Sequence, residues 1–405
     1  MNVVVTSFGS AGDFNPLLAV AAALVRRGVS VTFVANPFYE QRIRSTGCRF
    51  VGAGQFFDIF AALEANPRYL NVPTGAVAIW NELVVPSIRE IYPAVCRAVR
   101  DGGARIVVSH LLSYGGAWAA AQTGARSVAV TTTSTAWMSR HQPMILGNWR
   151  APRVVQGSLT VAIRGIGGIL MRTAVRRLAA QLGAPRVLDI VRAADLNLGT
   201  WPEWYRPPAS DDPPRARMCG FVFDPVDAMP PLASDLAAFL AAGEPPIVAG
   251  FGSAASLHAA ERYRAVAQAC ARLGRRCLLI GASAEVGAAT QSMAVPSAPY
   301  ARVFPAAAAI VHHGGFGTCG EALRAGRPSL VMPFAFDQFD SAARFEDAGL
   351  GHWLRGAADR ADVVAAGLDF ILRDPRVADA TQAAATRIAT SEDGADRAAE
   401  LIEAL

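Results

Sequence analysis

The chain has 405 residues, of which 52% are apolar and 18% are charged, and its formal net charge is +5. This length favours two domains, and the apolar content excludes a disordered chain because it is enough for two cores. All 38 basic residues are arginines, and most are scattered. A nucleic-acid-binding protein would show a clustered basic stripe, so we expect no nucleic-acid partner.

Cysteine spacing and hydropathy indicate the cellular compartment in which the protein functions. The six cysteines form no CxxC pair and no zinc-ligand spacing, so we expect buried thiols in a reducing compartment and no metal site. The first residues already read as a strand rather than as a signal peptide. No apolar run reaches the roughly 18–20 residues that cross a bilayer. The sequence therefore predicts a cytoplasmic protein.

The N-terminal half begins with a strand–helix–strand pattern. Residues 2–8 predict a buried parallel strand, and a glycine-containing loop follows it. A helix is predicted with Asn15 as its N-cap and Pro16 at its first position, and the next strand is predicted at 29–35. Two further buried strands are predicted, at 105–109 and 127–132. This rhythm predicts a doubly wound parallel sheet.

Two segments of this half, 54–90 and 135–180, are less regular and rich in bulky apolar residues. The second segment carries six arginines, at positions 150, 153, 164, 172, 176 and 177. It predicts an amphipathic basic helix pair, which could contact the inner face of a membrane or cover a lipophilic substrate. The alternative interpretation is a solvated helix face over the core.

A proline-rich stretch divides the chain into two halves. We expect a first Rossmann-like domain at 1–210, a linker at 211–232 and a second Rossmann-like domain at 233–384. A C-terminal helix at 385–405 is expected to pack back on the first domain. The elements predicted in the second half are strands at 247–251, 277–280, 306–311 and 329–332 and a helix at 257–272. The predicted class is α/β, with two parallel-sheet domains facing a central cleft.

A glycine-rich turn at 312–318 is the most informative stretch of the chain. It lies between a predicted buried strand and a predicted helix, so its backbone N–H groups and the helix dipole converge on one point. Such a turn is an anion site, and phosphate is the usual anion. The turn contains neither the Walker lysine nor the GxGxxG spacing of dinucleotide-binding proteins.

Four loops follow predicted strands and should therefore face the same cleft, namely 9–13, 252–253, 312–318 and 333–340. Two motifs that include residues of these loops resemble those of a known protein family. His312-His313-Gly314-Gly315-x-Gly317-Thr318, followed by Pro333-x-x-x-Asp337-Gln338, resembles the donor signature of family 1 glycosyltransferases. Gly9-Ser10-Ala11-Gly12-Asp13-x-x-Pro16 resembles the opening of their bacterial branch. That branch includes natural-product glycosyltransferases and glycolipid rhamnosyltransferases, and Phe336-Asp337-Gln338-Phe339-Asp340 is similar to the rhamnosyltransferase pattern.

This resemblance implies a GT-B fold, a nucleoside-diphosphate sugar donor, inversion at the anomeric carbon and no catalytic metal or cofactor. The residues expected to bind the donor diphosphate are His312, Gly314, Gly315, Phe316, Gly317, Thr318 and Ser253. His312 is expected to donate to the leaving diphosphate ahead of His313, whose side chain should point to the other side of the strand end. The alternatives are a structural histidine at 312 and a helix-capping serine at 253.

Asp13 is the expected general base, since a carboxylate in a partly desolvated cleft can take the proton of an attacking hydroxyl. Its alternative role is to interact with the start of the following helix. Asp337 and Gln338 match the pair that holds sugar hydroxyls in the family, and a carboxylate plus an amide supplies both acceptors and donors. The alternative role is an acidic cap at the N-terminus of the following helix.

The chain departs from the family pattern at the nucleoside. Ser297 stands near a position where many members carry a stacking tryptophan, so Tyr300 is the expected substitute. Glu321 lies nine residues after His312, whereas the ribose-binding glutamate of the family lies eight residues after the motif histidine. Both departures leave the nucleotide open between uridine and thymidine diphosphates.

The N-terminal half builds the acceptor pocket in this family, and its segments 54–90 and 135–180 are rich in apolar residues. The acceptor is therefore expected to be lipophilic. The expected lining residues, for each of which core packing is the alternative, are Trp80, Tyr92, His110, Trp118, Trp137 and His141. The sequence thus predicts an inverting transfer of rhamnose, another 6-deoxyhexose or glucose to a hydroxyl group. A nucleotide-sugar epimerase and a non-catalytic auxiliary or lipid-binding protein remain as alternatives.

Overall fold

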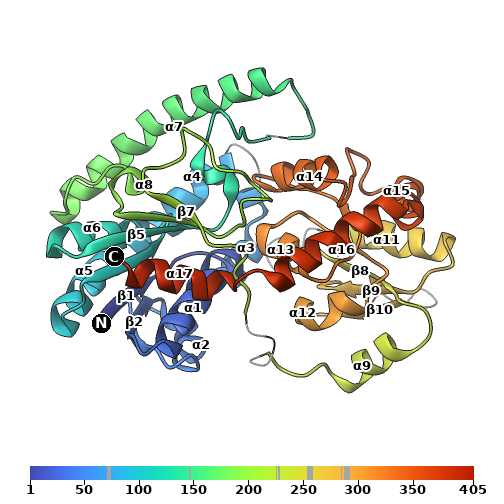
Figure 1. Cartoon of the computed structure of the whole chain (residues 1–405), viewed down its shortest axis with the longest axis horizontal. Helices are drawn as coiled ribbons and strands as arrows, with labels where there is room; N and C mark the ends of the chain where they lie inside the picture. Colours follow the sequence, from blue (N-terminus) through green and yellow to red (C-terminus); the bar gives the residue numbers. More distant parts are fainter. Residues whose placement is uncertain are drawn as a thin grey trace.

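The computed structural model describes residues 1–70, 74–145, 147–224, 226, 229–252, 259–283, 285–286 and 292–405. Within these residues the chain forms a seven-stranded and a six-stranded sheet, and every strand pair in both sheets is parallel. Figure 1 shows the two sheets side by side, each surrounded by helices. The predicted α/β class with two Rossmann-like parallel-sheet units is confirmed.

The first sheet has the strand order β3-β2-β1-β4-β5-β6-β7. Its strands are β1 Asn2–Thr6, β2 Ser30–Ala35, β3 Arg49–Gly52, β4 Ile106–His110, β5 Arg126–Thr131, β6 Leu196–Gly199 and β7 Ala216–Met218. Its helices are α1 Ala11–Arg26, α2 Glu40–Arg44, α3 Ile59–Ala65, α4 Thr74–Ile79, α5 Val85–Gly102, α6 Tyr114–Thr123, α7 Arg153–Leu182 and α8 Ile190–Ala193. A single π-helical segment, Trp80–Val84, joins α4 to α5 within the described residues.

The second sheet has the strand order β10-β9-β8-β11-β12-β13. Its strands are β8 Ile247–Gly250, β9 Cys277–Ile280, β10 Ser292–Val295, β11 Ala309–His312, β12 Ser329–Val331 and β13 Gly351–Trp353. The helices of this half are α9 Ser234–Ala241, α11 Ala260–Arg272, α12 Tyr300–Val303, α13 Phe316–Arg324, α14 Gln338–Asp347, α15 Ala361–Arg373, α16 Pro375–Thr390 and α17 Gly394–Glu403.

Each sheet reverses its strand order once, between β1 and β4 in the first sheet and between β8 and β11 in the second. At such a switch point the loops that follow the two central strands diverge and leave a crevice at their carboxyl ends. The loop with Asp13 follows β1, and the glycine-rich turn at 312–318 follows β11. The two motifs that carry the family resemblance therefore lie at the two switch points.

The chain end returns to the first sheet. In Figure 1, α17 lies beside α1. Ala395, Ala398 and Ile402 of α17 are buried in the same core as α1, and Arg26 of α1 pairs with Asp396 at 2.7 Å. One helix was expected at 385–405, but the structure has α16 and α17, separated where Asp393 caps the second helix.

Several elements differ from the sequence-based expectation. The strands β3, β6, β7, β10 and β13, which lie toward the edges of the sheets, were missed. The strand β7 lies inside the stretch expected as a linker, so the first sheet extends to Met218. The apolar basic segment forms one long helix, α7, rather than a helix pair. Among the described helices, α7 is also the one whose length and composition would suffice to span a membrane, which the sequence analysis did not expect.

Candidate active site between the two sheets

Asp13 lies in the first turn of α1, which begins five residues earlier than predicted. Ser10 is the N-cap, and the Oδ2 atom of Asp13 accepts hydrogen bonds from the Ser10 backbone N–H at 3.0 Å and from Ser10 Oγ at 3.2 Å. This capping interaction satisfies donors at the helix start, which is why the helix begins before Asn15. Gly9 has φ +131°, and a Cβ there would lie 2.7 Å from the Cβ of Asp13, so only glycine fits beside this carboxyl group.

His110, the last residue of β4, lies beside Asp13. Its Nε2 is 3.6 Å from the Oδ1 of Asp13 and 3.2 Å from the Oγ1 of Thr132. Its Nδ1 accepts a hydrogen bond from the Leu112 backbone N–H at 3.3 Å, so the ring proton resides on Nε2. Burial lowers the pKa of His110, although the charge of Asp13 opposes this shift. A neutral imidazole N–H therefore faces the carboxylate, a pairing that the sequence analysis missed when it assigned His110 to an acceptor pocket.

The glycine-rich turn has the geometry of an anion nest. Gly314 has φ +89°, and a Cβ there would lie 2.8 Å from the Gln338 carbonyl oxygen. Gly315 is the N-cap of α13, so the backbone N–H groups of Phe316, Gly317 and Thr318 belong to the first turn and have no intrahelical partner. The side chain of Phe316 is turned away into an aromatic cluster with Trp201, Tyr205 and Phe221, at centroid distances of 5.6–6.0 Å.

The two histidines of the turn have different surroundings. His312 is fully buried, and its Nδ1 accepts the Gly314 N–H at 3.1 Å. The His313 ring lies between two turns, because a Cβ on Gly252 would be 2.8 Å from its Cε1 and a Cβ on Gly315 would be 2.7 Å from the same atom. Burial lowers the pKa of His312 to about 3 and that of His313 to about 4, the second with help from the positive charge of Arg262. Both rings are neutral at pH 7, and His313 is the one in contact with both glycine turns.

Asp337 connects the two sheets. It is the N-cap residue of α14, and its Oδ2 accepts a hydrogen bond from the Oγ1 of Thr133, which follows β5 of the first sheet, at 2.9 Å. Burial raises the pKa of Asp337 to about 6, and the negative charges of Asp13 and Asp340 add to the shift, while the Thr133 hydrogen bond opposes it. The negative charge of Asp13, in α1 of the first sheet, thus acts on the carboxyl group that follows β12 of the second sheet.

Gln338 is held by its own loop. Its Oε1 accepts hydrogen bonds from the Phe334 and Ala335 backbone N–H groups at 2.7 and 3.1 Å, so its amide NH₂ group is turned away from them. Phe336, in the same turn, has φ +54°, which is unfavourable for a residue with a Cβ. Strain of this kind persists where the surrounding structure imposes it, commonly in ligand-binding loops.

The expected nucleoside residues are distributed around the second switch point. Tyr300 stacks on Phe304 with a centroid distance of 4.4 Å, and burial raises the pKa of its hydroxyl to about 12. Glu321 pairs with Arg324 at 2.5 Å on α13, and burial raises its pKa. Ser297 is exposed, and Ser253 lies outside the described residues.

Two of the expected acceptor-lining residues are core residues. Trp118 is 0% exposed, and its Nε1 donates to the Val187 carbonyl at 2.9 Å. Trp137 is 4% exposed, and its Nε1 donates to Thr131 Oγ1 at 3.1 Å. The prediction for these two residues is wrong, because a bulky indole gains more from burial with a satisfied N–H than from lining an open pocket. Trp80 is half-buried against Tyr114, and His141 is exposed.

A cavity of about 290 Å³ lies next to the Asp13 loop. Its lining includes Phe8, Gly9, Tyr39, Phe57 and Leu83, and the other residues are Ser7, Asn36, Ala53, Gly54, Gln55, Ile59, Glu82, Pro86, Ser87, Arg89, Glu90 and Ile91. Most of this wall comes from the segment 54–90 that the sequence analysis assigned to an acceptor pocket. The individual residues could not be identified in advance because they come from segments that follow three different strands.

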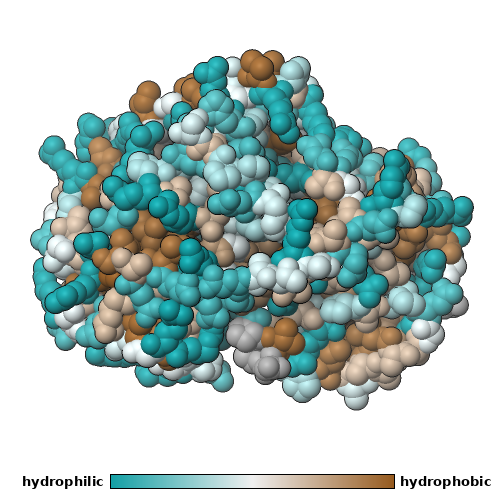
Figure 2. All heavy atoms as spheres, viewed as in Figure 1, coloured by the Kyte–Doolittle hydropathy of each residue, from teal (hydrophilic) through white to brown (hydrophobic). Residues whose placement is uncertain are grey.

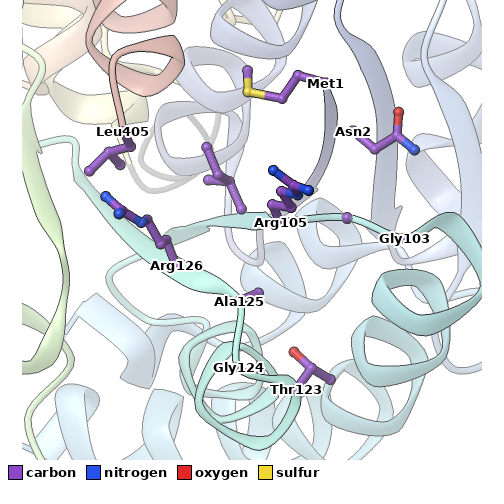
Figure 3. Close-up of a pocket in the computed structure, with 11 residues that line it drawn as sticks. Met1, Asn2, Gly103, Arg105, Thr123, Gly124, Ala125, Arg126 and Leu405 are labelled. Atoms are coloured by element: carbon purple, nitrogen blue, oxygen red, sulfur yellow. The ribbon is translucent and has the colours of Figure 1, made fainter.

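A second cavity, of about 970 Å³, lies at the opposite edge of the first sheet. Figure 3 shows its lining, which includes Met1, Arg105, Arg126 and Leu405. It lies at the amino ends of β1, β4 and β5, whereas ligands of doubly wound sheets bind at the carboxyl ends. Among the described residues, no group of three His, Cys, Asp or Glu side chains could hold a metal ion.

The chain is similar to glycosyltransferases along its whole length. Residues 283–404 match the family described as Erythromycin biosynthesis protein CIII-like, C-terminal domain. The chain is 27% identical to O-mycaminosyltylonolide 6-deoxyallosyltransferase of Streptomyces fradiae, over 100% of this chain and 97% of that protein. It is 28% identical to vancomycin aglycone glucosyltransferase of Amycolatopsis orientalis, over 99% and 97% of the two chains.

A solved structure shows the same fold. The glycosyltransferase VinC in complex with dTDP superposes with a TM-score of 0.71 at 21% sequence identity, over 100% of this chain and 99% of that chain. The two parallel sheets, the order of the motifs along the chain and the named relatives all indicate a glycosyltransferase. The chain is therefore similar along its whole length to bacterial natural-product glycosyltransferases, and it has the fold of the solved glycosyltransferase, with two Rossmann-like parallel-sheet domains.

Proposed function

We propose that this enzyme is a cytoplasmic, metal-independent, inverting glycosyltransferase that moves a sugar from a dTDP- or UDP-linked donor to a hydroxyl group of a lipophilic acceptor. A relative named as a 6-deoxyallosyltransferase supports a 6-deoxyhexose such as rhamnose, and one named as a glucosyltransferase supports glucose. The similar structure that binds dTDP supports a thymidine donor.

Asp13 is the general base of the proposed reaction. The acceptor oxygen attacks the anomeric carbon and its proton passes to the Asp13 carboxylate, while the bond between that carbon and the diphosphate oxygen breaks. Attack opposite the leaving group inverts the configuration. His110 acts as a positioning residue, because its Nε2–H faces Oδ1 while Ser10 holds Oδ2.

The nest at 314–318 stabilises the charge that grows on the leaving diphosphate. We assign the side-chain donor to His313 rather than to His312, because the His313 ring contacts the turns at Gly252 and Gly315. Glu321 lies eight residues after His313, which is the family spacing between the motif histidine and the ribose-binding glutamate. The apparent departure at Glu321 therefore disappears when the motif is aligned on His313.

Asp337 and Gln338 are proposed to hold the sugar hydroxyls. The Asp337 carboxylate retains acceptor capacity beyond the Thr133 hydrogen bond, and the Gln338 amide provides a donor. The 290 Å³ cavity beside Gly9 is the proposed acceptor pocket, since its aromatic and aliphatic lining suits a lipophilic molecule and it adjoins the loop that carries the base.

A single arrangement supports this function best: His110 Nε2 lies 3.6 Å from Asp13 Oδ1 and 3.2 Å from Thr132 Oγ1, and the next residue, Thr133, bonds to Asp337 at 2.9 Å. The proposed base of one sheet and the proposed sugar site of the other therefore meet at the end of β5. The test uses Asp13→Asn, in which the amide oxygen can still accept from the Ser10 N–H and keep the helix cap. We expect transfer to fall by about 10²–10⁴-fold, with the melting temperature and nucleotide affinity unchanged.

The control is Asp393→Asn, because the Asp393 side chain also caps a helix, α17, but lies outside the proposed site, and its transfer rate should equal that of wild type. Assays combine dTDP- and UDP-sugars with a panel of lipophilic alcohols, and mass spectrometry follows the glycoside. Undiminished turnover in Asp13→Asn would reject the assigned base. Conversion of a nucleotide sugar to its epimer without an acceptor would instead identify an epimerase.

A further inference from the structure

The helix α7 exposes an apolar stripe to solvent. Val155, Leu159, Ile166, Ile169 and Leu170 recur at helical spacing and are between 40% and 68% exposed. Soluble proteins rarely expose contiguous apolar patches of this kind without a partner. Figure 1 shows α7 along the upper margin of the molecule, and Figure 2 shows hydrophobic residues on that margin among hydrophilic ones.

Both ends of α7 bury side chains against the protein body, whereas the outward side of its middle is exposed. Gln156, Thr160, Val175 and Leu178 are buried. Between these anchors, an added Cβ at the helical glycines 165, 167 or 168 would meet nothing within 4 Å. Of the most apolar 18-residue window, only 17% is buried. Because its two ends pack in the fold, α7 lies along the surface and does not cross a bilayer in this structure.

The charge of α7 is entirely positive. The residues 153–182 contain five arginines and no acidic residue. Arg164 and Arg172 lie 3.7 and 3.6 Å from Asp211 and Asp189. Arg176 and Arg177 are exposed at the C-terminal end of the stripe, and neither forms an ion pair within the described residues.

We propose that α7 docks this enzyme on an anionic lipid bilayer, with the helix axis in the plane of the interface. Apolar side chains on an outward face insert at the boundary between headgroups and acyl chains, and nearby arginines bind the anionic headgroups. The stripe from Val155 to Leu170 is about 22 Å long at 1.5 Å per residue. Two copies of α7 packed together would bring arginine against arginine with no carboxylate on either helix, which disfavours a homodimer through this face.

The test measures binding of the full chain to vesicles, without any sugar substrate, so its outcome is separate from that of the proposed transfer reaction. The triple variant Ile166→Ser, Ile169→Ser, Leu170→Ser removes the centre of the stripe. Sedimentation with vesicles of phosphatidylcholine and phosphatidylglycerol should show at least a tenfold lower partition coefficient than wild type. Vesicles of phosphatidylcholine alone should bind the wild type much more weakly.

The matched control replaces exposed apolar residues elsewhere, Val77→Ser with Phe370→Ser, and should bind as wild type does. The second variant, Arg176→Gln with Arg177→Gln, keeps the stripe and should lose about fivefold per arginine at low salt. Melting temperatures verify that each variant folds. The proposal is wrong if wild type does not bind anionic vesicles at low ionic strength, or if the triple variant binds equally well. A wild-type dimer that the triple variant loses in analytical ultracentrifugation would assign the face to a second copy instead.

Discussion

Gly315→Ala tests the assignment of His313 to the diphosphate. Gly315 has φ −60° and ψ 137°, a conformation that alanine adopts without strain. The new methyl group would overlap the His313 imidazole, 2.7 Å from its Cε1. Because Gly314 and the start of α14 hold the backbone of the turn in place, the ring has to move out of the nest.

The expected loss follows from the hydrogen bond that His313 would make. A hydrogen bond to a charged group contributes about 1.5–3 kcal/mol, which corresponds to about 10–150-fold weaker binding of a nucleoside diphosphate. The protein should still fold, because replacing an N-cap glycine with alanine typically costs about 1 kcal/mol. We therefore expect a large change in affinity with a small change in melting temperature.

Isothermal titration calorimetry with thymidine and uridine diphosphates measures the effect. The comparison is a double-mutant cycle, in which Gly315→Ala is also made in a His313→Ala background and should then have no further effect. An equal loss in both backgrounds would mean that the methyl group blocks the ligand directly. Wild-type affinity in the Gly315→Ala enzyme would refute the placement of His313 at the diphosphate.

Three further predictions concern other sites. Burial raises the pKa of Asp337 to about 6, so protonation of this carboxyl group stabilises the folded state fully below about pH 4, and this contribution is lost as pH rises through about 6. The melting temperature of Asp337→Asn should therefore exceed that of wild type by more above pH 6 than below pH 4. A difference in melting temperature that is independent of pH would contradict this. Asp212→Ala would leave the fully buried Arg206 without its carboxylate and should cost about 3–5 kcal/mol in urea unfolding. Trp118→Ala should cost about 3–5 kcal/mol because the indole is fully buried, and a cost below about 1 kcal/mol would show that Trp118 is not a core residue.

Local patterns in the sequence were sufficient for the parallel-sheet class and for the main motifs. Central strands such as β1, β4 and β11 are short apolar runs because both faces of a parallel sheet are buried. The nest is also local, since a strand, a glycine turn and a helix N-terminus follow one another in the chain. The sequence could also have predicted the earlier start of α1, because Ser10 and Asp13 are three residues apart, which is the spacing of a capping box.

The edge strands could not be predicted from such patterns. The strand β7 has three residues and little apolar periodicity, so its pairing with β6 depends on the rest of the sheet being formed. Likewise, an apolar indole looks the same in a sequence whether it lines a pocket or fills a core. Only the packing of α6 against its neighbours decided that Trp118 is buried.

The sequence by itself determined the fold class, the glycine-rich turn before α13 and the carboxylate near the start of α1, because each depends on residues close together in the chain. Only the tertiary structure decided that His110 faces Asp13 and that Thr133 bonds to Asp337, since 97 and 204 residues separate these pairs. It also decided that the His313 ring lies against the turns at Gly252 and Gly315. Alternation along a strand end sends the two rings to opposite sides, and the side occupied by Gly252 and Gly315 depends on how the second sheet is assembled.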